Sequence, residues 1–215
     1  MTMAYRHLEE VRRDWRERRT AIERRLRDFR RVGLGTDREL FAELAFCLFA
    51  IQTSARRSDG AVRGLTANGL LWRGSQREIA AFLRSRVRFH NHKAAYLVAA
   101  RDRFFGGGDS ITGLVRSPPS ESRQWLIRTI DGIGHKEASH FLRNVGRGED
   151  FAILDRHILK NLVRHGVIRG IPTSLTDKRY LAIEERVRAF ADDVRIPMAA
   201  IDLIFWSRET GEVFK

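Results

Sequence analysis

Apolar residues recur along this chain at helical spacing, in blocks that short polar or glycine-rich stretches separate. Over residues 4–31 the apolar positions lie within a dense background of arginine and glutamate. These positions are Leu8, Val11, Trp15, Ile22, Leu26 and Phe29. The spacing predicts a long amphipathic helix with a solvated charged face.

Capping signals predict where the next helices begin. The motif Thr36-x-x-Glu39 is a capping box and predicts a buried helix that runs to about Ala50. A second box at residues 75–78 predicts a helix near residues 79–83.

Polar and glycine-rich stretches predict the breaks of the first half. Residues 51–57 are interpreted as the polar end of the buried helix, before Gly60. Residues 89–92 are interpreted as a polar-aromatic loop that precedes an apolar helical pattern over residues 95–99. Three consecutive glycines at 106–108 form a strong break.

The second half of the chain gives the same kind of signal. Ser120 is predicted to cap a helix over residues 121–130, and a further helix follows up to about residues 146–148. The remaining predicted helices run from Asp155 to Gly166, from the box at 174–177, and from Pro197 to about Ser207. No sustained period-two alternation and no fixed-length repeat appears, so we predict an all-α fold.

Composition narrows the class of partner. The 215 residues can form one large or two small domains. The net charge of +13 favours a polyanionic partner, most simply nucleic acid or, less often, an anionic membrane surface. A genome-wide arginine bias is the alternative. The only cysteine, Cys47, lies in an apolar run and is interpreted as a buried residue, so four cysteines for an iron–sulfur site are not available. Without an evident signal peptide or membrane-length apolar run, we expect a cytoplasmic protein.

One stretch concentrates the candidate chemistry. Gly132 and Gly134, one residue apart, predict a tight hairpin followed by a helix whose first N–H groups favour a phosphate. Lys136 lies in that first turn, where the helix dipole disfavours a cation and partial burial would favour a neutral, nucleophilic amine. A solvent-facing lysine is the alternative. The chain has only five lysines among 40 basic residues, and arginine cannot replace an amine nucleophile.

Asp155 opens the next helix and is the candidate partner of Lys136. An ordinary N-cap, worth about 1 kcal/mol, explains it equally well, but a capping carboxylate also stays ionised. It could stabilise positive charge on a deoxyribose or help to deprotonate Lys136. An amine that attacks sugar C1′ and then eliminates the 3′ phosphate needs no metal or redox cofactor, and we expect none.

Contacts with the rest of a DNA substrate are less clearly marked. The N–H groups of Gly132 and Gly134 are predicted to position one phosphate, without reading sequence. Because a stacked base is unreachable, it must be flipped out, and Gln52 and Phe89 are candidates to fill the gap. Trp206 could stack on the flipped base. Each of these three side chains has an ordinary structural alternative, a helix terminus, a turn and a core aromatic residue.

The runs 132–146 and 152–162, together with Trp206 and Lys215, resemble the type-2 8-oxoguanine DNA glycosylase/lyase family of helix-hairpin-helix proteins. The resemblance covers essentially the whole chain. It implies that Lys136 and Asp155 are catalytic, that Trp206 stacks on the lesion, and that Lys215 distinguishes 8-oxoguanine from guanine through a terminal carboxylate. From the sequence alone, Lys215 would be a frayed end.

The same resemblance implies two helical domains with the active site in the cleft between them. One comprises residues 1–36 and 156–215, and the other comprises residues 37–155 and ends in the helix-hairpin-helix at about 120–146. We therefore expect a bifunctional 8-oxoguanine glycosylase/AP lyase of base excision repair. It would act as a monomer on double-stranded DNA containing the lesion, near the nucleoid of a prokaryote and without membrane contact.

Two alternatives stay open. An endonuclease III-like enzyme for oxidised pyrimidines would share the chemistry, although such enzymes generally carry four cysteines for an iron–sulfur cluster. A non-catalytic helix-hairpin-helix module would bind DNA without covalent chemistry.

Overall fold

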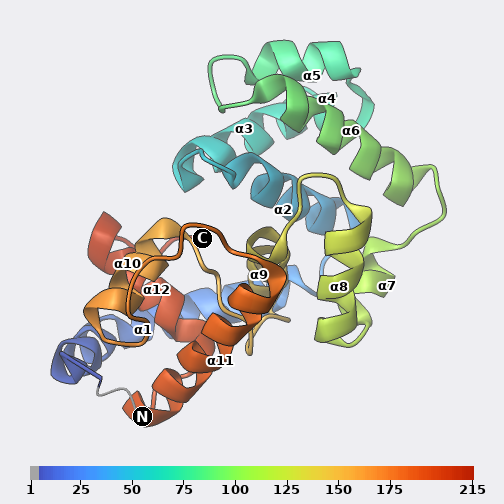
Figure 1. Ribbon diagram of the computed structural model, residues 1–215. Helices are drawn as coiled ribbons and strands as arrows, with labels where there is room; N and C mark the ends of the chain where they lie inside the picture. Colours follow the sequence, from blue (N-terminus) through green and yellow to red (C-terminus); the bar gives the residue numbers. More distant parts are fainter. Residues whose placement is uncertain (1–4) are drawn as a thin grey trace.

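Twelve helices make up residues 5–215 of the computed structural model, the part of the chain that the structure describes (Figure 1). They are α1 Leu8–Val32, α2 Asp37–Ala50, α3 Ala55–Ala67, α4 Leu70–Arg73, α5 Gln76–Leu83, α6 His90–Phe105, α7 Ile111–Arg116, α8 Pro119–Thr129, α9 His135–Asn144, α10 Arg156–Arg164, α11 Asp177–Val194 and α12 Met198–Thr210. This described part contains no strand, and the all-α prediction is confirmed.

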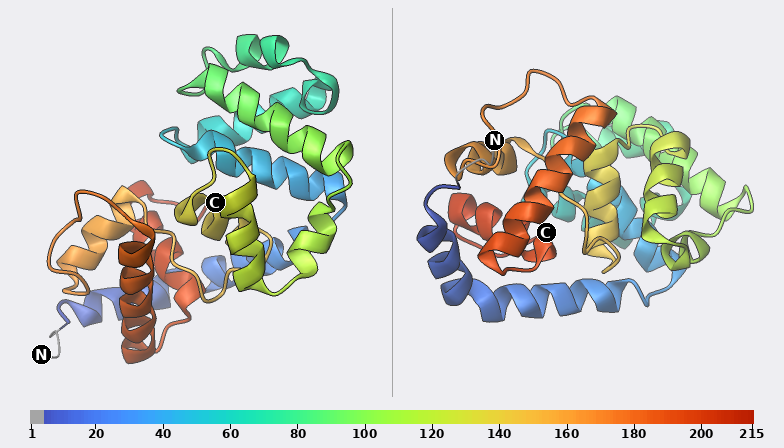
Figure 2. Two further views of the ribbon diagram at one scale, coloured as in Figure 1. Left: turned by 45° about the vertical axis from the view of Figure 1, so that its right-hand side comes forward. Right: turned by 60° about the horizontal axis from the view of Figure 1, so that its bottom comes forward.

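The buried apolar side chains form two hydrophobic clusters. The first lies among α2–α9 and includes every buried apolar residue from Leu40 to Val145. The second is formed by α1 and α10–α12, with the segment that precedes α10. Figures 1 and 2 show α1, α10, α11 and α12 gathered at one side of the molecule, although α1 is far from the others in sequence.

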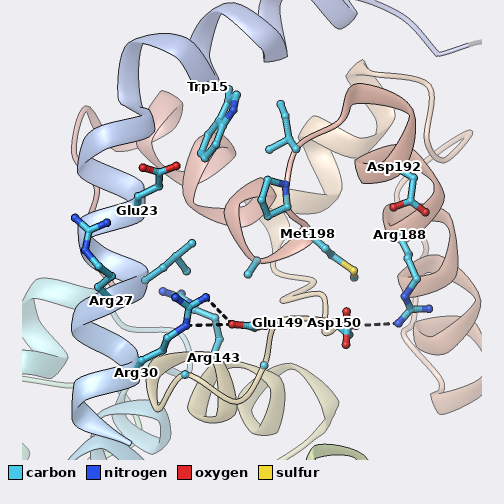
Figure 3. A pocket seen from close by; sticks show the side chains of 16 residues that line it. Trp15, Glu23, Arg27, Arg30, Arg143, Glu149, Asp150, Arg188, Asp192 and Met198 are labelled. Atoms are coloured by element: carbon cyan, nitrogen blue, oxygen red, sulfur yellow. Dashed lines mark hydrogen bonds and ion pairs between the residues drawn. The ribbon is translucent and has the colours of Figure 1, made fainter.

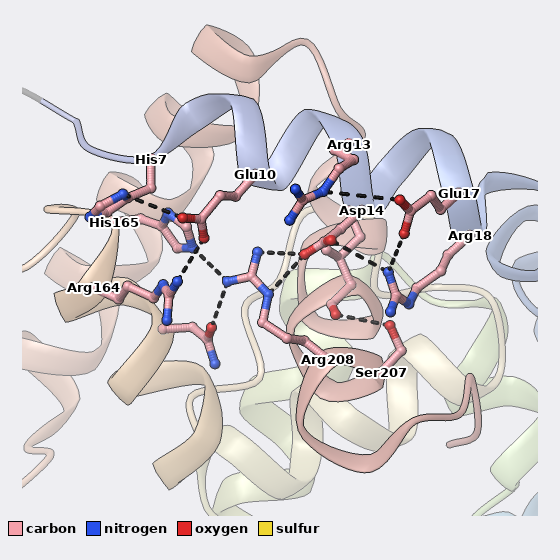
Figure 4. Close-up of polar contacts among 12 residues, drawn as sticks. His7, Glu10, Arg13, Asp14, Glu17, Arg18, Arg164, His165, Ser207 and Arg208 are labelled. Atoms are coloured by element: carbon pink, nitrogen blue, oxygen red, sulfur yellow. Dashed lines mark hydrogen bonds and ion pairs between the residues drawn. The ribbon is translucent and has the colours of Figure 1, made fainter.

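An ion pair joins α1 to α12 within the second cluster (Figure 4). Nε of Arg208 lies 2.8 Å from Oδ2 of Asp14, which is buried. A second guanidinium nitrogen of Arg208 lies 3.0 Å from Nε2 of His165, whose Nδ1 lies 3.0 Å from the carbonyl oxygen of Arg6. Burial lowers the pKa of His165 and favours the neutral ring. In that ring, Nε2 accepts a hydrogen bond from Arg208 and Nδ1 donates one to the carbonyl oxygen of Arg6.

The local capping predictions for two helices are confirmed. Thr36 and Glu39 form the capping box of α2, and Ser75 and Glu78 form that of α5. Cys47 is fully buried within α2. These signals could be read from the sequence because each involves residues three positions apart.

The prediction of a polar break at residues 51–57 is wrong beyond Ser54. Ser54 caps α3, which continues through Gly60 to Ala67. The glycines of α3 made the helix difficult to predict from the sequence. Gly64 has a packing role, because a Cβ there would lie 2.5 Å from the ring of Phe82. Burial of one apolar face therefore outweighs the weak helix propensity.

Other boundaries also shift. Residues 90–92 form the first turn of α6 rather than a loop, and α1 begins at Leu8 (residue 4 lies outside the described residues). Pro118, not Ser120, occupies the N-cap of α8, because Pro119 suits the first helical position. Thr176 rather than residue 174 caps α11.

Candidate active site

The turn between α8 and α9 requires one of its two glycines. Gly132 has a φ of +81°, and a Cβ there would lie 2.6 Å from the ring of Tyr96. Gly134 is the N-cap of α9 with extended backbone, where a Cβ would meet only Glu137 at an ordinary 3.5 Å. Its N–H donates to Oε2 of Glu137 at 3.3 Å. Backbone conformation and the contact with Tyr96 therefore require glycine at Gly132, whereas neither requires it at Gly134.

Lys136 is the second residue of α9, as the sequence predicts. Its Nζ lies 3.0 Å from Oε1 of Glu137, and its side chain is 24% exposed. One carboxylate therefore contacts both the hairpin backbone and the amine. This arrangement places the amine at the wall of a pocket rather than in bulk solvent.

Asp155 caps α10. Its Oδ1 accepts from the N–H groups of His157 and Ile158, both at 2.8 Å. The segment before it is tied to α11, because Tyr180 donates to the carbonyl of Ala152 at 2.6 Å. The position of Asp155 therefore depends on a helix more than twenty residues away in sequence.

A cavity of about 810 Å³ brings most of the predicted residues together. Its walls come from the end of α2, the start of α3, α9, the start of α10, α12 and the residues after α12. The predicted residues that line it are Gln52, Lys136, Asp155, Trp206 and Lys215. Phe89 is not among the lining residues. It is 50% exposed and contacts Arg88, which does line the cavity.

Lys136 and Asp155 share this cavity without a direct ion pair between them in the described chain. Asp155 bonds the start of its own helix, and Lys136 bonds Glu137. The arrangement presents an amine and a carboxylate to the same cavity, which is what a substrate bound in that cavity would require. Such a pair can supply a nucleophile and a stabilising negative charge.

Comparison with known proteins decides the family. A family model described as 8-oxoguanine DNA glycosylase matches residues 22–196. The chain belongs to this family. The 8-oxoguanine DNA glycosylase/AP lyase of Fusobacterium nucleatum is 40% identical over 213 residues, which cover 97% of this chain and 98% of that protein.

Solved structures of the family have the same fold. The crystal structure of the Thermotoga maritima 8-oxoguanine DNA glycosylase has a TM-score of 0.88 at 37% identity and covers 97% of this chain and 98% of that chain. The Methanocaldococcus jannaschii 8-oxoguanine glycosylase/lyase, crystallised with a 15mer DNA containing 8-oxoguanine, has a TM-score of 0.88 at 31% identity. It covers 97% of this chain and 99% of that one.

Several further polar residues line the cavity of this family member without a signal that the sequence made obvious, and three of them are deeply placed on α9 and α12. They are His140, Arg143 and Asp202. Burial lowers the pKa of His140 well below its usual value and raises that of Asp202, although Arg143 at 3.2 Å opposes the second shift. Helical spacing could have found them, because they lie four or seven residues from Lys136 or four from Trp206.

Arg143 lines both this cavity and a second one of about 580 Å³, which Figure 3 shows. Its guanidinium lies 4.7 Å from the ring centre of Phe29 in α1. The second cavity is bounded by the Arg30–Glu149 ion pair, whose nitrogen and oxygen are 2.7 Å apart. Neither Lys136 nor Asp155 lines this second cavity, so the candidate chemistry belongs to the first one.

A buried lysine fixes the turn that carries Gln52. Nζ of Lys93 donates to the carbonyl oxygens of Phe49 and Ile51, both at 2.7 Å, and to Oγ1 of Thr53 at 3.0 Å. Gln52 has a φ of +51°, a left-handed conformation that is uncommon for this residue type. Burial lowers the pKa of Lys93 to about 8. The amine thus holds the wall of the cavity in a strained turn.

Residues 5–215 contain no cluster of three or more His, Cys, Asp or Glu side chains that could hold a metal ion. Among the helices of the same residues, none combines the length and the apolar character that crossing a membrane requires.

Proposed function

We propose that this chain is a bifunctional DNA glycosylase/AP lyase that excises 8-oxoguanine during base excision repair. The observation that carries the proposal is the placement of Lys136. Its amine lies at a helix start, beside a glycine hairpin, in a cavity that also contains Asp155. Family membership and the activity named for relatives across bacteria and archaea support the substrate.

In the proposed reaction, Nζ of Lys136 attacks C1′ of the damaged nucleotide. The C1′–N9 bond breaks, and its electron pair leaves with the base, which takes up a proton. Ring opening gives a protonated imine between Lys136 and C1′. Loss of a C2′ proton then breaks the C3′–O3′ bond, so the 3′ phosphate leaves, and water hydrolyses the imine to release the enzyme.

Asp155 has an electrostatic role in this proposal. Positive charge develops on the sugar as the base departs, and a carboxylate held by two helix N–H groups needs no reorganisation to stabilise it. Before the attack, Lys136 must lose a proton. Glu137 contacts the amine directly, so its carboxylate is placed to accept that proton.

The remaining predicted residues are proposed as substrate contacts. Gly132 and Gly134 would position a phosphate, which would replace Oε2 of Glu137 as the acceptor of the Gly134 N–H. Trp206 and Lys215 line the cavity and are proposed to contact the flipped base.

Gln52 and Phe89 would contact the gap and the unpaired base that flipping leaves behind. Gln52 is exposed at the cavity wall, and Phe89 is half exposed nearby, beside Arg88. Both residues have a left-handed backbone conformation outside the helices.

The two hydrophobic clusters support a division into two domains, residues 1–36 with 156–215 and residues 37–155, except that Ala152 and Leu154 pack in the cluster of the first of these. We propose that DNA binds over the cleft between the two domains. We further propose that the protein acts as a monomer on double-stranded DNA containing 8-oxoguanine, in the cytoplasm of a prokaryote.

Borohydride trapping tests the proposal. Incubation with an 8-oxoguanine duplex should give a covalent adduct that disappears in Lys136→Gln. Binding without an adduct would indicate a non-catalytic DNA-binding module. Adducts formed only with oxidised pyrimidines would indicate an endonuclease III-like substrate range. Extension of the chain beyond Lys215 should impair 8-oxoguanine excision more than cleavage at an abasic site, and equal effects would remove Lys215 from the base pocket.

A further inference from the structure

The residues after α12 form one wall of the active-site cavity and are fastened to α3. Gly211 turns the chain with a φ of +79°, and Glu212, Phe214 and Lys215 then line the cavity. Nε of Arg56 lies 2.9 Å from Oε1 of Glu212, and the guanidinium lies 4.9 Å from the ring centre of Phe214. This segment, residues 211–215, is called the tail below.

The far end of the tail is held by a more enclosed contact. Nζ of Lys215 lies 2.8 Å from Oε2 of Glu43 in α2 and 3.4 Å from Oδ1 of Asp59 in α3. The same ammonium lies 4.7 Å from the ring centre of Phe46. The side chains of Lys215, Glu43 and Asp59 are 21%, 7% and 17% exposed, so all three are largely shielded from water.

Glu43 links the tail to the helix of the nucleophile. Its Oε1 accepts a hydrogen bond from the side-chain amide of Asn144 in α9, and its Oε2 accepts from Lys215. A buried carboxylate without a counter-charge is strongly destabilised. Within residues 5–215, Lys215 is the cation paired with Glu43. The pair therefore connects the tail, α2 and α9 through one buried charge.

We propose that Glu43 and Asp59 are positioning residues that form a socket for the Lys215 ammonium and thereby set the selectivity of the pocket for the damaged base. This rests on the proposed function. The tail has no helical hydrogen bonds beyond the one that Gly211 donates to Ser207, so the socket and the Arg56 contact, together with the packing of Val213 and Phe214, must offset the cost of ordering it. A preformed wall avoids that cost when the base enters.

The proposal separates two activities of one site. An intact nucleotide places a base against the tail, whereas an abasic site has no base to place there. Loss of the socket should therefore reduce excision of 8-oxoguanine more than it reduces β-elimination at an abasic site. A general loss of folding or of DNA binding would reduce both activities together.

The test uses Lys215→Met, which keeps the length of the chain, and Glu43→Gln, which keeps the shape. Single-turnover excision from 8-oxoguanine and guanine duplexes is compared with trapping at a preformed abasic site. We expect each variant to lower the ratio of 8-oxoguanine excision to abasic cleavage by about tenfold. The double variant should lower the ratio no further than the worse single variant, because both substitutions remove the same Lys215–Glu43 contact. Lys215→Arg should largely restore the ratio.

Arg56→Gln is the matched control, because it loosens the tail at an exposed contact and leaves the socket intact. It should change the ratio less than Glu43→Gln. Hydrogen exchange provides a readout without activity, in which the tail amides of Lys215→Met and Glu43→Gln exchange faster than those of wild type. Should Glu43→Gln fail to fold, Asp59→Asn tests the other carboxylate of the socket, and Arg63→Gln is its control because Asp59 also pairs with Arg63.

The socket proposal is overturned if the single variants keep the wild-type ratio and the wild-type tail exchange. A wild-type protein that cleaves abasic sites but does not excise 8-oxoguanine would instead overturn the proposed function. Tail exchange would still report on the socket in that case, so the two failures are distinguishable.

Discussion

Nζ of Lys136 lies 3.0 Å from Oε1 of Glu137, its neighbour along α9. The other oxygen of Glu137 accepts from the N–H of Gly134, so one carboxylate connects the amine to the hairpin. The contact holds the candidate nucleophile beside the proposed phosphate site. Lys136 is the proposed nucleophile, and Glu137 is proposed to accept its proton.

Lys136→Gln should abolish the borohydride adduct, since a glutamine amide cannot form an imine. Glu137→Gln keeps the amine and a hydrogen-bonding group for Gly134, so adducts should still form, at a reduced rate. Gel analysis of trapped complexes on one duplex measures both. An adduct in Lys136→Gln would place the nucleophile elsewhere.

Asp155→Asn separates catalysis from helix capping. Asparagine caps helices about as well as aspartate, so the free energy of unfolding should change by no more than about 0.5 kcal/mol. Excision should fall by about 100-fold, because the stabilising charge is lost. Denaturant unfolding and single-turnover kinetics on the same preparation measure the two effects. Asp155→Ala should in addition lose about 1 kcal/mol of stability. Full activity in Asp155→Asn would show that Asp155 acts only as the N-cap of α10 and not in catalysis.

The two hairpin glycines should respond differently to alanine. Gly132→Ala combines a positive φ with a 2.6 Å contact to Tyr96 and should cost about 2 kcal/mol or more. Gly134→Ala has extended backbone and space, so it should cost about 1 kcal/mol or less, as expected for an N-cap. Thermal unfolding ranks the two variants, and equal losses would contradict the hairpin geometry.

Lys93 should give the protein a distinctive dependence on alkaline pH. Its native pKa of about 8 lies below its usual value of 10.5, so the native state releases this proton first. The contribution of Lys93 to the free energy of unfolding therefore becomes more favourable from about pH 8 to 10.5 and less favourable as the pH falls through 8. Denaturant unfolding of wild type and Lys93→Met across this range isolates it, because other titrations cancel. If the difference in unfolding free energy between wild type and Lys93→Met stays constant over this pH range, the pKa of Lys93 is not lowered in the native state.

The fold was predictable where its signals are local. The Thr36 and Ser75 caps and the glycine hairpin each involve residues within a few positions, and these boundaries are confirmed. Helix α3 was not predicted, because its glycines lower the local helix propensity. Gly64 lies in the helix because it packs closely against Phe82. Tertiary burial of that kind leaves little trace in a single sequence.

The same distinction holds for the candidate site. Lys136 and Asp155 lie in short motifs at helix starts, and the structure places both in one cavity. The contacts of Lys93 with Phe49 and of Lys215 with Glu43 span 44 and 172 residues. No spacing rule reaches that far, so these supporting contacts required coordinates.

The Asp14–Arg208 pair has a consequence for the time course of synthesis. Its partners are 194 residues apart, so at about 5–20 residues per second the first helix is made roughly 10–40 s before the last one emerges. Throughout that interval the apolar stripe of α1 has no native partner from α12. The nascent chain therefore carries a long amphipathic segment whose apolar stripe lacks its α12 contacts until synthesis of α12 allows the second cluster to close.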